Sequence, residues 1–317
     1  MRRVRTWFDP FVVLILLALV LGLVLPLPAP AIDGVQTVGD VAIFLLFLVY
    51  GLRLSTREVL GGLRNWRLQG SIFAATYVLF PLLGLLIAAV AQPLLGAALA
   101  AGMLYLTLLP STVQSSVAFV SVARGNVAGA ICAATLSNVV GMVLTPLLVL
   151  WLMGATGGQG MGGIQAVLVH LLLPFVIGQL LQPFLGDWVR AHRPITKVLD
   201  QGTVVLLVLG AVLSATADGV WQQVSAWMLV ALLVLCGVLL AAMLLVTWYG
   251  GRGLGLDRGD RIALLMCGSK KSLATGLPMA LVIFTPATAA TIAVPVIVFH
   301  QLQLVVCAAL ARRLARS

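Results

Sequence analysis

The sequence predicts an all-α, polytopic membrane protein, and three observations support this fold class. Of the 317 residues, 62% are hydrophobic and 9% are charged, and the mean hydropathy is +1.14, which leaves too few polar side chains to cover a soluble domain. Apolar runs of about 20 residues recur along the chain, and each is long enough to cross a hydrocarbon core of ~30 Å as a helix. The runs are continuous rather than alternating, so spanning strands are not expected.

Ten apolar segments are expected to cross the membrane. The predicted spans, in chain order, are residues 11–28, 38–54, 69–91, 95–121, 127–151, 164–183, 200–217, 226–248, 262–283 and 288–310. The connections between them are short, so no soluble domain is expected outside the membrane.

The basic residues alternate between successive connections. The N-terminus, the even-numbered loops and the C-terminus hold 17 of the 19 Lys and Arg residues, and the odd-numbered loops hold none. By the positive-inside rule, both termini then lie on the cytoplasmic side of a cell membrane, which requires an even number of spans. The net charge of +10 thus reflects topology, and no basic soluble face is available to bind nucleic acid.

Two features of the sequence allow other interpretations. The segment Met1–Ala31 resembles a secretory signal, but its cleavage would leave nine spans and break the alternation of charge. The four cysteines all lie within predicted spans at no ligand spacing, so we expect packing roles and no metal, disulfide or cofactor site.

The chain divides near its middle at the glycine-rich stretch Met153–Gly163. Five predicted spans lie in residues 1–155 and five in 156–317, so the halves cross the membrane in opposite senses. Inverted repeats of this kind are typical of secondary transporters, whose substrate sites lie near the midplane at interrupted helices. The fourth and ninth spans each contain a polar interruption, at Leu109–Phe119 and Gly268–Pro278.

The two interruptions are the candidate binding site. A helix break within a membrane persists only where it is buried in protein or lines a watery cavity, and Pro110 and Gly268 are suitable helix breakers. The polar side chains beside the breaks are Ser111, Thr112, Gln114, Ser115, Ser116, Ser269, Ser272 and Thr275. Alternatively, these hydroxyls bond to helix carbonyls and help the helices to pack closely.

Lys270 and Lys271 are the two basic residues that fall outside the loops. Counting ~1.5 Å per residue from Asp260 at the expected membrane edge puts them ~14 Å deep, near the midplane. A lysine side chain reaches only ~6 Å, so it cannot carry its charge back to the headgroups. An unpaired charge there costs ~3–10 kcal/mol. Adjacent helical positions point ~100° apart, so at least one lysine is expected to face the protein interior.

Three arrangements would accommodate a lysine at this depth. In the first arrangement, the site contains water and binds an anion, and helix N-termini add favourable dipoles. Alternatively, the lysine loses its proton, since burial and a like-charged neighbour both disfavour the charged form. In the third arrangement, carbonyls of the broken helices hold the ammonium group permanently. A lysine that is charged with an anion bound and neutral when empty would couple transport to a proton.

Four segments resemble the bile acid:sodium symporter family, in particular its SBF-like branch. These are Tyr50–Ser55 (YGLRLS), Leu109–Ile131, Leu144–Pro146 (LTP) and Gly268–Ala280, which contains the KKSLATG run. The resemblance implies ten helices in two inverted repeats, with broken fourth and ninth helices that cross near the midplane. It also implies a panel of residues 11–54 and 164–217 and a core of residues 69–151 and 226–310.

The sodium sites of that family are only partly matched. Ser116 falls where the resemblance implies a sodium-binding serine. Thr76 stands where the resemblance implies a glutamine on the third helix. The hydroxyls of the fifth helix fall near Ala130 and Ala134, with Thr135 adjacent.

The position of the acidic sodium ligand falls near Gly268, and the nine acidic residues of this chain lie in loops or at span ends. A coupling cation, H⁺ or Na⁺, is expected, and a proton or the lysines themselves suit this chain better than the usual sodium sites.

Weaker candidates lie within the spans. Ser137 and Asn138 lie in the fifth span and would line the core, although packing explains them equally well. In the tenth span, His300 with Gln301 and Gln303 would relay protons, although a single histidine in a span is at least as often a hydrogen-bonded packing residue.

We expect a secondary transporter of a small, amphipathic organic anion that works by alternating access. Its partners would be the substrate and the lipid bilayer, with no nucleic acid, and its state a monomer or a weak homodimer. The alternative is a membrane sensor or scaffold of the same fold that transports nothing. An enzyme is not expected, because the sequence has no paired carboxylates and no credible Ser/His/Asp set.

Overall fold

The computed structural model describes residues 10–25, 27–53, 65–154, 165–219, 222 and 225–316, and within these ranges it contains helices and no strands. The helices are α1 (Pro10–Val24), α2 (Ala29–Arg53), α4 (Trp66–Ala74), the π-helix η1 (Ala75–Leu79), α5 (Phe80–Leu108), α6 (Gln114–Val122), α7 (Val127–Met153), the π-helix η3 (Leu168–Leu172), α9 (Leu173–Ala191), α10 (Arg193–Ala217), α11 (Ala226–Gly253), α12 (Arg258–Gly268), α13 (Leu273–Ile283) and α14 (Pro286–Leu314).

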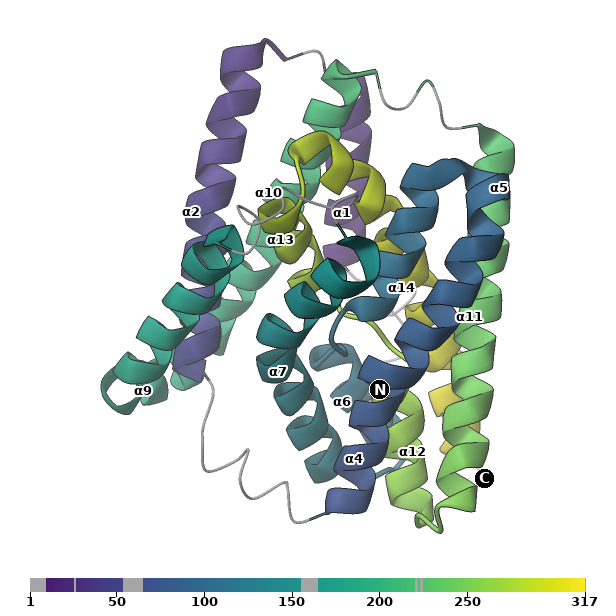
Figure 1. Ribbon diagram of the computed structural model, residues 1–317. Coiled ribbons are helices and arrows are strands. Elements are labelled where there is room, and N and C mark those ends of the chain that lie inside the picture. The colour runs from purple at the N-terminus through teal and green to yellow at the C-terminus, as the bar shows by residue number, and fades with distance from the viewer. Residues whose placement is uncertain are drawn as a thin grey trace, which may run out of the picture.

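Seven helical stretches in this part of the chain are long and apolar enough to cross a membrane. They are Ala29–Arg53, Trp66–Leu108, Val127–Met153, Gln165–Ala191, Pro194–Ala217, Ala226–Gly253 and Pro286–Leu314. The protein is therefore a multi-pass membrane protein. The stretch Trp66–Leu108 has 43 residues, or ~65 Å of helix, but Gly96 takes a non-helical conformation with φ of 78°. Figure 1 shows the chain doubling back there.

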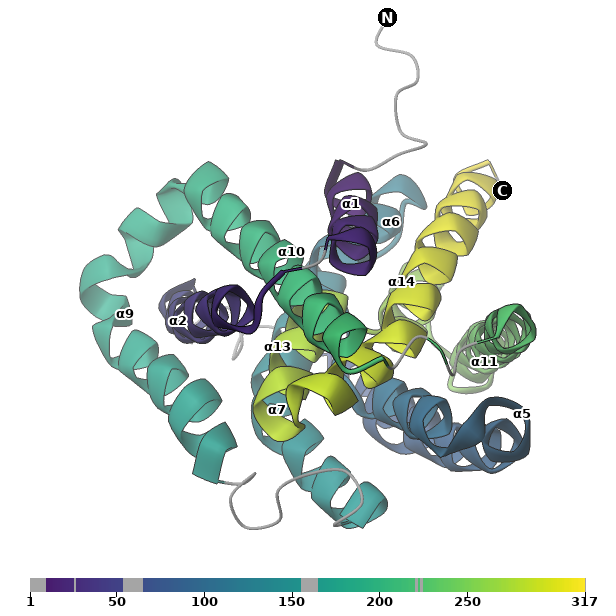
Figure 2. The same cartoon turned by 90° about the horizontal axis from the view of Figure 1, so that it is seen from above.

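One group of helices consists of α1, α2, α9 and α10. Figure 2 shows α9 curving around α2, and the helix contains Pro183 in its interior. Gly51 of α2 packs against Gly178 of α9 so closely that a Cβ atom on either would meet the backbone of the other helix. The Arg53 guanidinium donates to the Asp200 carboxylate of α10 at 2.7 Å. Polar and close backbone contacts thus join these helices.

The second group consists of α4–α7 and α11–α14, and three of these helices meet at Asp260. The carboxylate of Asp260, near the start of α12, accepts hydrogen bonds from the side-chain amides of Asn65 and Asn126, each at 2.7 Å. The backbone N–H of Asn126 donates to the Gly259 carbonyl at 3.0 Å. One carboxylate therefore fixes the starts of α4, α7 and α12 together.

Several helices are longer than the sequence predicts. α2 begins at Ala29 rather than 38, α9 continues to Ala191 rather than 183, and α10 begins at Arg193 rather than 200. The predicted spans mark apolar runs, and a helix can continue past the hydrocarbon edge, so residues such as Arg190 lie within helices. The predicted linker at 155–163 and the N-terminal residues 1–9 lie outside the described residues.

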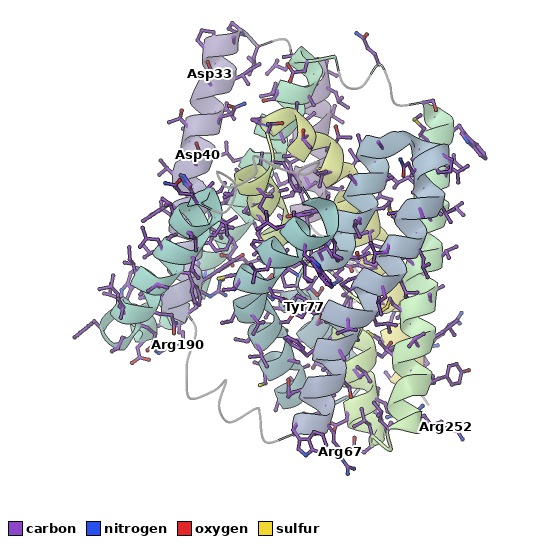
Figure 3. All side chains as sticks on the ribbon, in the orientation of Figure 1. Asp33, Asp40, Arg67, Tyr77, Arg190 and Arg252 are labelled. Carbon is purple, nitrogen blue, oxygen red and sulfur yellow. The ribbon has the colours of Figure 1, made fainter. Side chains whose placement is uncertain are left out.

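Both polar interruptions are breaks in helical structure. α5 ends at Leu108 and α6 begins at Gln114, while α12 ends at Gly268 and α13 begins at Leu273. In Figure 3, Arg67, Arg190 and Arg252 lie toward one end of the molecule and Asp33 lies at the other. Tyr77 lies between those two ends (Figure 3).

Candidate functional site

The non-helical residues 109–113 and 269–272, called the crossing below, run past each other in the second group of helices. The backbone N–H of Ser272 donates to the Pro110 carbonyl at 2.8 Å, which joins the two segments directly. Each break leaves helix-end carbonyls without an intrahelical donor, and in a membrane each of these needs another partner.

Serine side chains from the crossing and from α6 satisfy the carbonyls that end α12. The Ser111 hydroxyl donates to the Cys267 carbonyl at 2.6 Å, and the Ser116 hydroxyl to the Met266 carbonyl at 3.1 Å. Ser269 bonds back to the Leu265 carbonyl at 2.5 Å. These three serines therefore act as caps for α12, as the packing interpretation of the hydroxyls predicts.

Side chains of α7 bond to the end of α5 and to the first segment. The Thr145 hydroxyl donates to the Leu108 carbonyl at 2.8 Å, and the Asn138 amide to the Ser111 carbonyl at 2.8 Å. The backbone N–H of Ser111 donates to the Ser137 hydroxyl at 3.0 Å. Ser137 and Asn138 thus stabilise the non-helical backbone of the first segment.

Asn138 also links the first segment to α13. The Thr275 hydroxyl donates to the Asn138 side-chain oxygen at 2.8 Å, and it lies 2.9 Å from the Ser272 hydroxyl. Ser272 caps α13 by accepting from the Thr275 backbone N–H. One amide therefore connects both breaks, and the half-helix α13 begins at the crossing with its positive dipole end.

The two lysines point to opposite sides of the crossing. The ~100° separation expected for a helix was wrong, because residues 270–272 are not helical. Lys270 faces α6, where its Nζ lies near Ser115. Lys271 faces η1 and the end of α5, where its Nζ bonds to Thr76 and Leu109.

Lys271 is buried, with 1% of its surface exposed, and its ammonium group is held on several sides. Nζ donates to the Leu109 carbonyl at 2.7 Å and to the Thr76 carbonyl at 2.9 Å. It also lies 4.2 Å from the ring centroid of Phe80 and 5.9 Å from that of Tyr77. Lys271 therefore matches the arrangement in which backbone carbonyls hold the ammonium group.

Lys270 is equally buried but has fewer partners. Its exposed fraction is 0%, and in the described part of the chain its Nζ has one polar partner, the Ser115 hydroxyl at a long 3.4 Å. The ring centroid of Phe119 lies 4.4 Å away. An ammonium group carries three N–H donors, so Lys270 retains donor capacity that Lys271 has used.

The Ser115 hydroxyl belongs to a cluster at the start of α6. The Thr112 hydroxyl lies 2.8 Å from each of the hydroxyls of Ser115 and Ser116, and α6 begins with no side-chain cap. Gln114, the first residue of α6, is exposed, and Ser115 and Phe119 are half-buried. The buried Lys270 ammonium group therefore contacts half-buried residues of α6, close to the exposed start of that helix.

Gln303 of α14 was named in the sequence only as part of a proton relay, but it positions Lys271. Its side-chain oxygen accepts from the Lys271 backbone N–H at 2.9 Å, and its Nε2 donates to the Lys271 carbonyl at 2.8 Å. Nε2 also lies 2.9 Å from His300 Nδ1. Gln303 thus satisfies both backbone groups of the non-helical Lys271, and no pattern in the sequence named this partner.

The remaining candidates do not join the crossing through their side chains. Thr76 contributes its backbone carbonyl, while its hydroxyl is buried without a hydrogen-bond partner in the described part of the chain. Thr135 is half-buried on α7, and Gln301 has a buried amide nitrogen that likewise lacks a partner there. His300 contacts Gln303, which in turn bonds to the crossing.

The aromatic side chains around the lysines were also missed from the sequence. Tyr105 donates its hydroxyl to the Gly276 carbonyl at 2.7 Å, and Tyr77 donates to the Ser137 carbonyl at 2.5 Å. Phe80 and Phe119 cover the two ammonium groups. Their spacing in the sequence resembles that of ordinary core residues, so only the fold reveals their positions.

Comparison with known proteins confirms the family that the sequence motifs indicated. The profile of the SBF-like CPA transporter family matches residues 9–316. The uncharacterized protein PA2026 of Pseudomonas aeruginosa is 44% identical over 283 residues, which cover 89% of this chain and 85% of that protein. YfeH of Escherichia coli, whose name carries a provisional assignment as a symporter, is 38% identical over 310 residues, or 98% of this chain and 93% of YfeH.

A more distant relative is sodium/bile acid cotransporter 7 of Mus musculus. It is 24% identical over 307 residues, which cover 96% of this chain and 90% of the mouse protein. The names of this relative and of the matched family describe transport across membranes and not catalysis. The chain therefore belongs to the SBF-like CPA transporter family, a family of membrane transporters rather than enzymes.

Proposed function

We propose that this protein is a secondary transporter of a small organic anion, with Lys270 as the group that binds the negative charge. The observation that carries the proposal is that the buried Lys270 ammonium group has one hydroxyl partner, at 3.4 Å, in the described part of the chain. A charged group at this depth is expensive, and a bound carboxylate or sulfonate would supply the missing acceptors.

The surroundings of Lys270 favour an amphipathic anion. The hydroxyl cluster of Thr112, Ser115 and Ser116 offers hydrogen bonds to oxygen atoms, and the Phe119 ring offers an apolar surface. The uncapped N-terminus of α6 adds a positive dipole end. A bile acid, which appears in the name of the mouse relative, is an amphipathic carboxylate and shares this chemistry.

We further propose ten crossings in two inverted repeats, with both termini on the cytoplasmic side of the cell membrane. Three features support this arrangement: the reversal of α5 at Gly96, the two breaks, and the gathering of Arg67, Arg190 and Arg252 toward one end in Figure 3. Residues 1–155 and 156–317 would form the repeats.

Alternating access would follow from movement between the two groups of helices. α10 of the first group packs on α13 and α14 of the second, and this contact includes small apolar side chains, Ala211, Ala215 and Ala290, with Leu281 packed on them. Small, smooth contacts oppose sliding less than the hydrogen bonds within each group. The first group would serve as the panel and the second as the core that carries the crossing.

The coupling ion in this proposal is a proton carried by Lys270, charged with the anion bound and neutral when the site is empty. Neither Lys270 nor Lys271 has a carboxylate partner among the described residues. Without an acidic ligand at the crossing, Na⁺ has no charged group to bind there, so transport should continue in its absence.

The test is solid-supported-membrane electrophysiology on purified protein in liposomes, with a panel of carboxylates and sulfonates at two pH values, with and without Na⁺. Lys270→Gln removes the charge, and Lys197→Gln, at an exposed lysine of α10, is the matched control. The proposal expects currents that persist without Na⁺ in the wild type and in Lys197→Gln, and that vanish in Lys270→Gln. Currents that require Na⁺ and survive Lys270→Gln would overturn it, and silence across the panel would favour the sensor alternative.

A further inference from the structure

The Lys271 ammonium group occupies a small cage of backbone oxygens and aromatic rings. Its Nζ bonds to the carbonyls of Leu109 and Thr76 at 2.7 and 2.9 Å, and the Phe80 ring centroid is 4.2 Å away. These contacts account for the three N–H donors of an ammonium group: two on carbonyls and one toward a ring face.

The backbone creates the cage before the lysine fills it. In an α-helix, the N–H of Phe80 would bond to the Thr76 carbonyl, but in the π-helix η1 it bonds to Ala75 instead. Pro81, the next residue, has no N–H to offer. The Thr76 carbonyl is therefore released from the helix, as happens at π-bulges in functional sites.

The Leu109 carbonyl is released by the break. Leu109 follows the last residue of α5 and takes an extended conformation, with ψ of 155°, so its carbonyl leaves the helical direction. The C-terminal end of a helix also carries a partial negative charge. The two free carbonyls and the C-terminal end of α5 thus create a negative potential at the position of the Lys271 ammonium group.

The composition of the cage indicates which cation it fits. Divalent cations are usually held by carboxylates, and among the described residues no carboxylate forms an ion pair with Lys271. Neutral carbonyls and ring faces suit a monovalent cation, either an inorganic ion or an alkylammonium group. The Thr76 hydroxyl, which is buried and has no hydrogen-bond partner in the described residues, is a further oxygen on the same residue.

We propose that this cage is a monovalent-cation site that the protein fills with its own Lys271 side chain. Removal of the side chain would open the site to a free cation such as Na⁺, K⁺, ammonium or methylammonium. The proposal rests on the geometry of the cage and not on the transport proposal, so either can fail without the other.

The test compares the thermal melting of purified Lys271→Ala in salts of these four cations with melting in N-methylglucamine, which is too large for the cage, at equal ionic strength. Lys271→Met fills the space without a charge. Lys270→Ala is the matched control, because its ammonium group bonds to no carbonyl in the described structure. Each variant is purified in methylammonium and then exchanged, so a variant that folds only with a cation present still gives a result.

The proposal expects Lys271→Ala to regain most of its lost melting temperature with at least one small cation. The melting temperatures of the wild type, Lys271→Met and Lys270→Ala should not depend on the cation. Melting of Lys271→Ala that is the same in all five salts would overturn the proposal. So would the failure of Lys271→Ala to fold in methylammonium while Lys271→Met folds.

Discussion

Replacement of Gln303 by leucine tests how the crossing is held in shape. Leucine has a similar size but removes the acceptor for the Lys271 N–H and the donor for the Lys271 carbonyl. A buried backbone group left without a partner costs about 1–3 kcal/mol, so two such groups cost about 2–6 kcal/mol. We do not add the contact to His300, because that side chain has other interactions.

The chain provides a matched control two residues away. Gln301 lies on the same helix, but its amide nitrogen is buried without a hydrogen-bond partner in the described residues. Gln301→Leu removes this unsatisfied donor, so we expect its free energy of unfolding to change by no more than about 0.5 kcal/mol, or to rise.

The assay is thermal unfolding in detergent, followed by intrinsic tryptophan fluorescence. A chain of this size shifts by roughly 2 °C per kcal/mol, so Gln303→Leu should melt about 4–12 °C below the wild type, and Gln301→Leu close to it. Equal shifts for the two variants would refute the role assigned to Gln303.

Three further predictions concern other parts of the fold. Asp260→Ala leaves two half-buried asparagine amides without an acceptor and should cost about 1–3 kcal/mol by the same melting assay; a shift below one degree would contradict this. Arg53→Met isolates the buried Asp200 carboxylate and should cost about 3 kcal/mol, and the double variant with Asp200→Leu should regain most of that loss; additive losses would count against a coupled pair. Ala290→Leu overfills the contact with Ala211, so it should abolish anion-evoked currents while lowering stability by only about 1–3 kcal/mol; currents of normal size would argue against sliding at this contact.

The breaks and their polar side chains could be predicted because their causes are local. Pro110 lacks an N–H, and a serine-rich run in an apolar span leaves few explanations other than a buried polar site. The ends of α2, α9 and α10 could not be predicted, because composition marks the hydrocarbon edge and not the end of the helix. These helices continue beyond the apolar runs while remaining helical.

The different environments of Lys270 and Lys271 depend on contacts distant in sequence. The oxygens around Lys271 come from Leu109 and from Thr76, 162 and 195 positions away, and the Thr76 carbonyl is available only because of a one-residue shift in helical bonding. Such a shift leaves no periodic signal in the sequence. The two hydrogen bonds between Gln303 and the Lys271 backbone could not be predicted either, because one glutamine in an apolar helix indicates a buried polar contact but not its partner.

The central claim, that the surface beside Lys270 lies on a transport path, is tested most directly by labelling from each side of the membrane. Ser115→Cys would be placed in a background whose four native cysteines are replaced by alanine, and oriented vesicles would be treated with a membrane-impermeant thiol reagent. The account predicts labelling from both sides, slowed by an organic anion, and no anion effect when Lys270→Gln is also present. Labelling from one side only, unchanged by every anion tested, would contradict it.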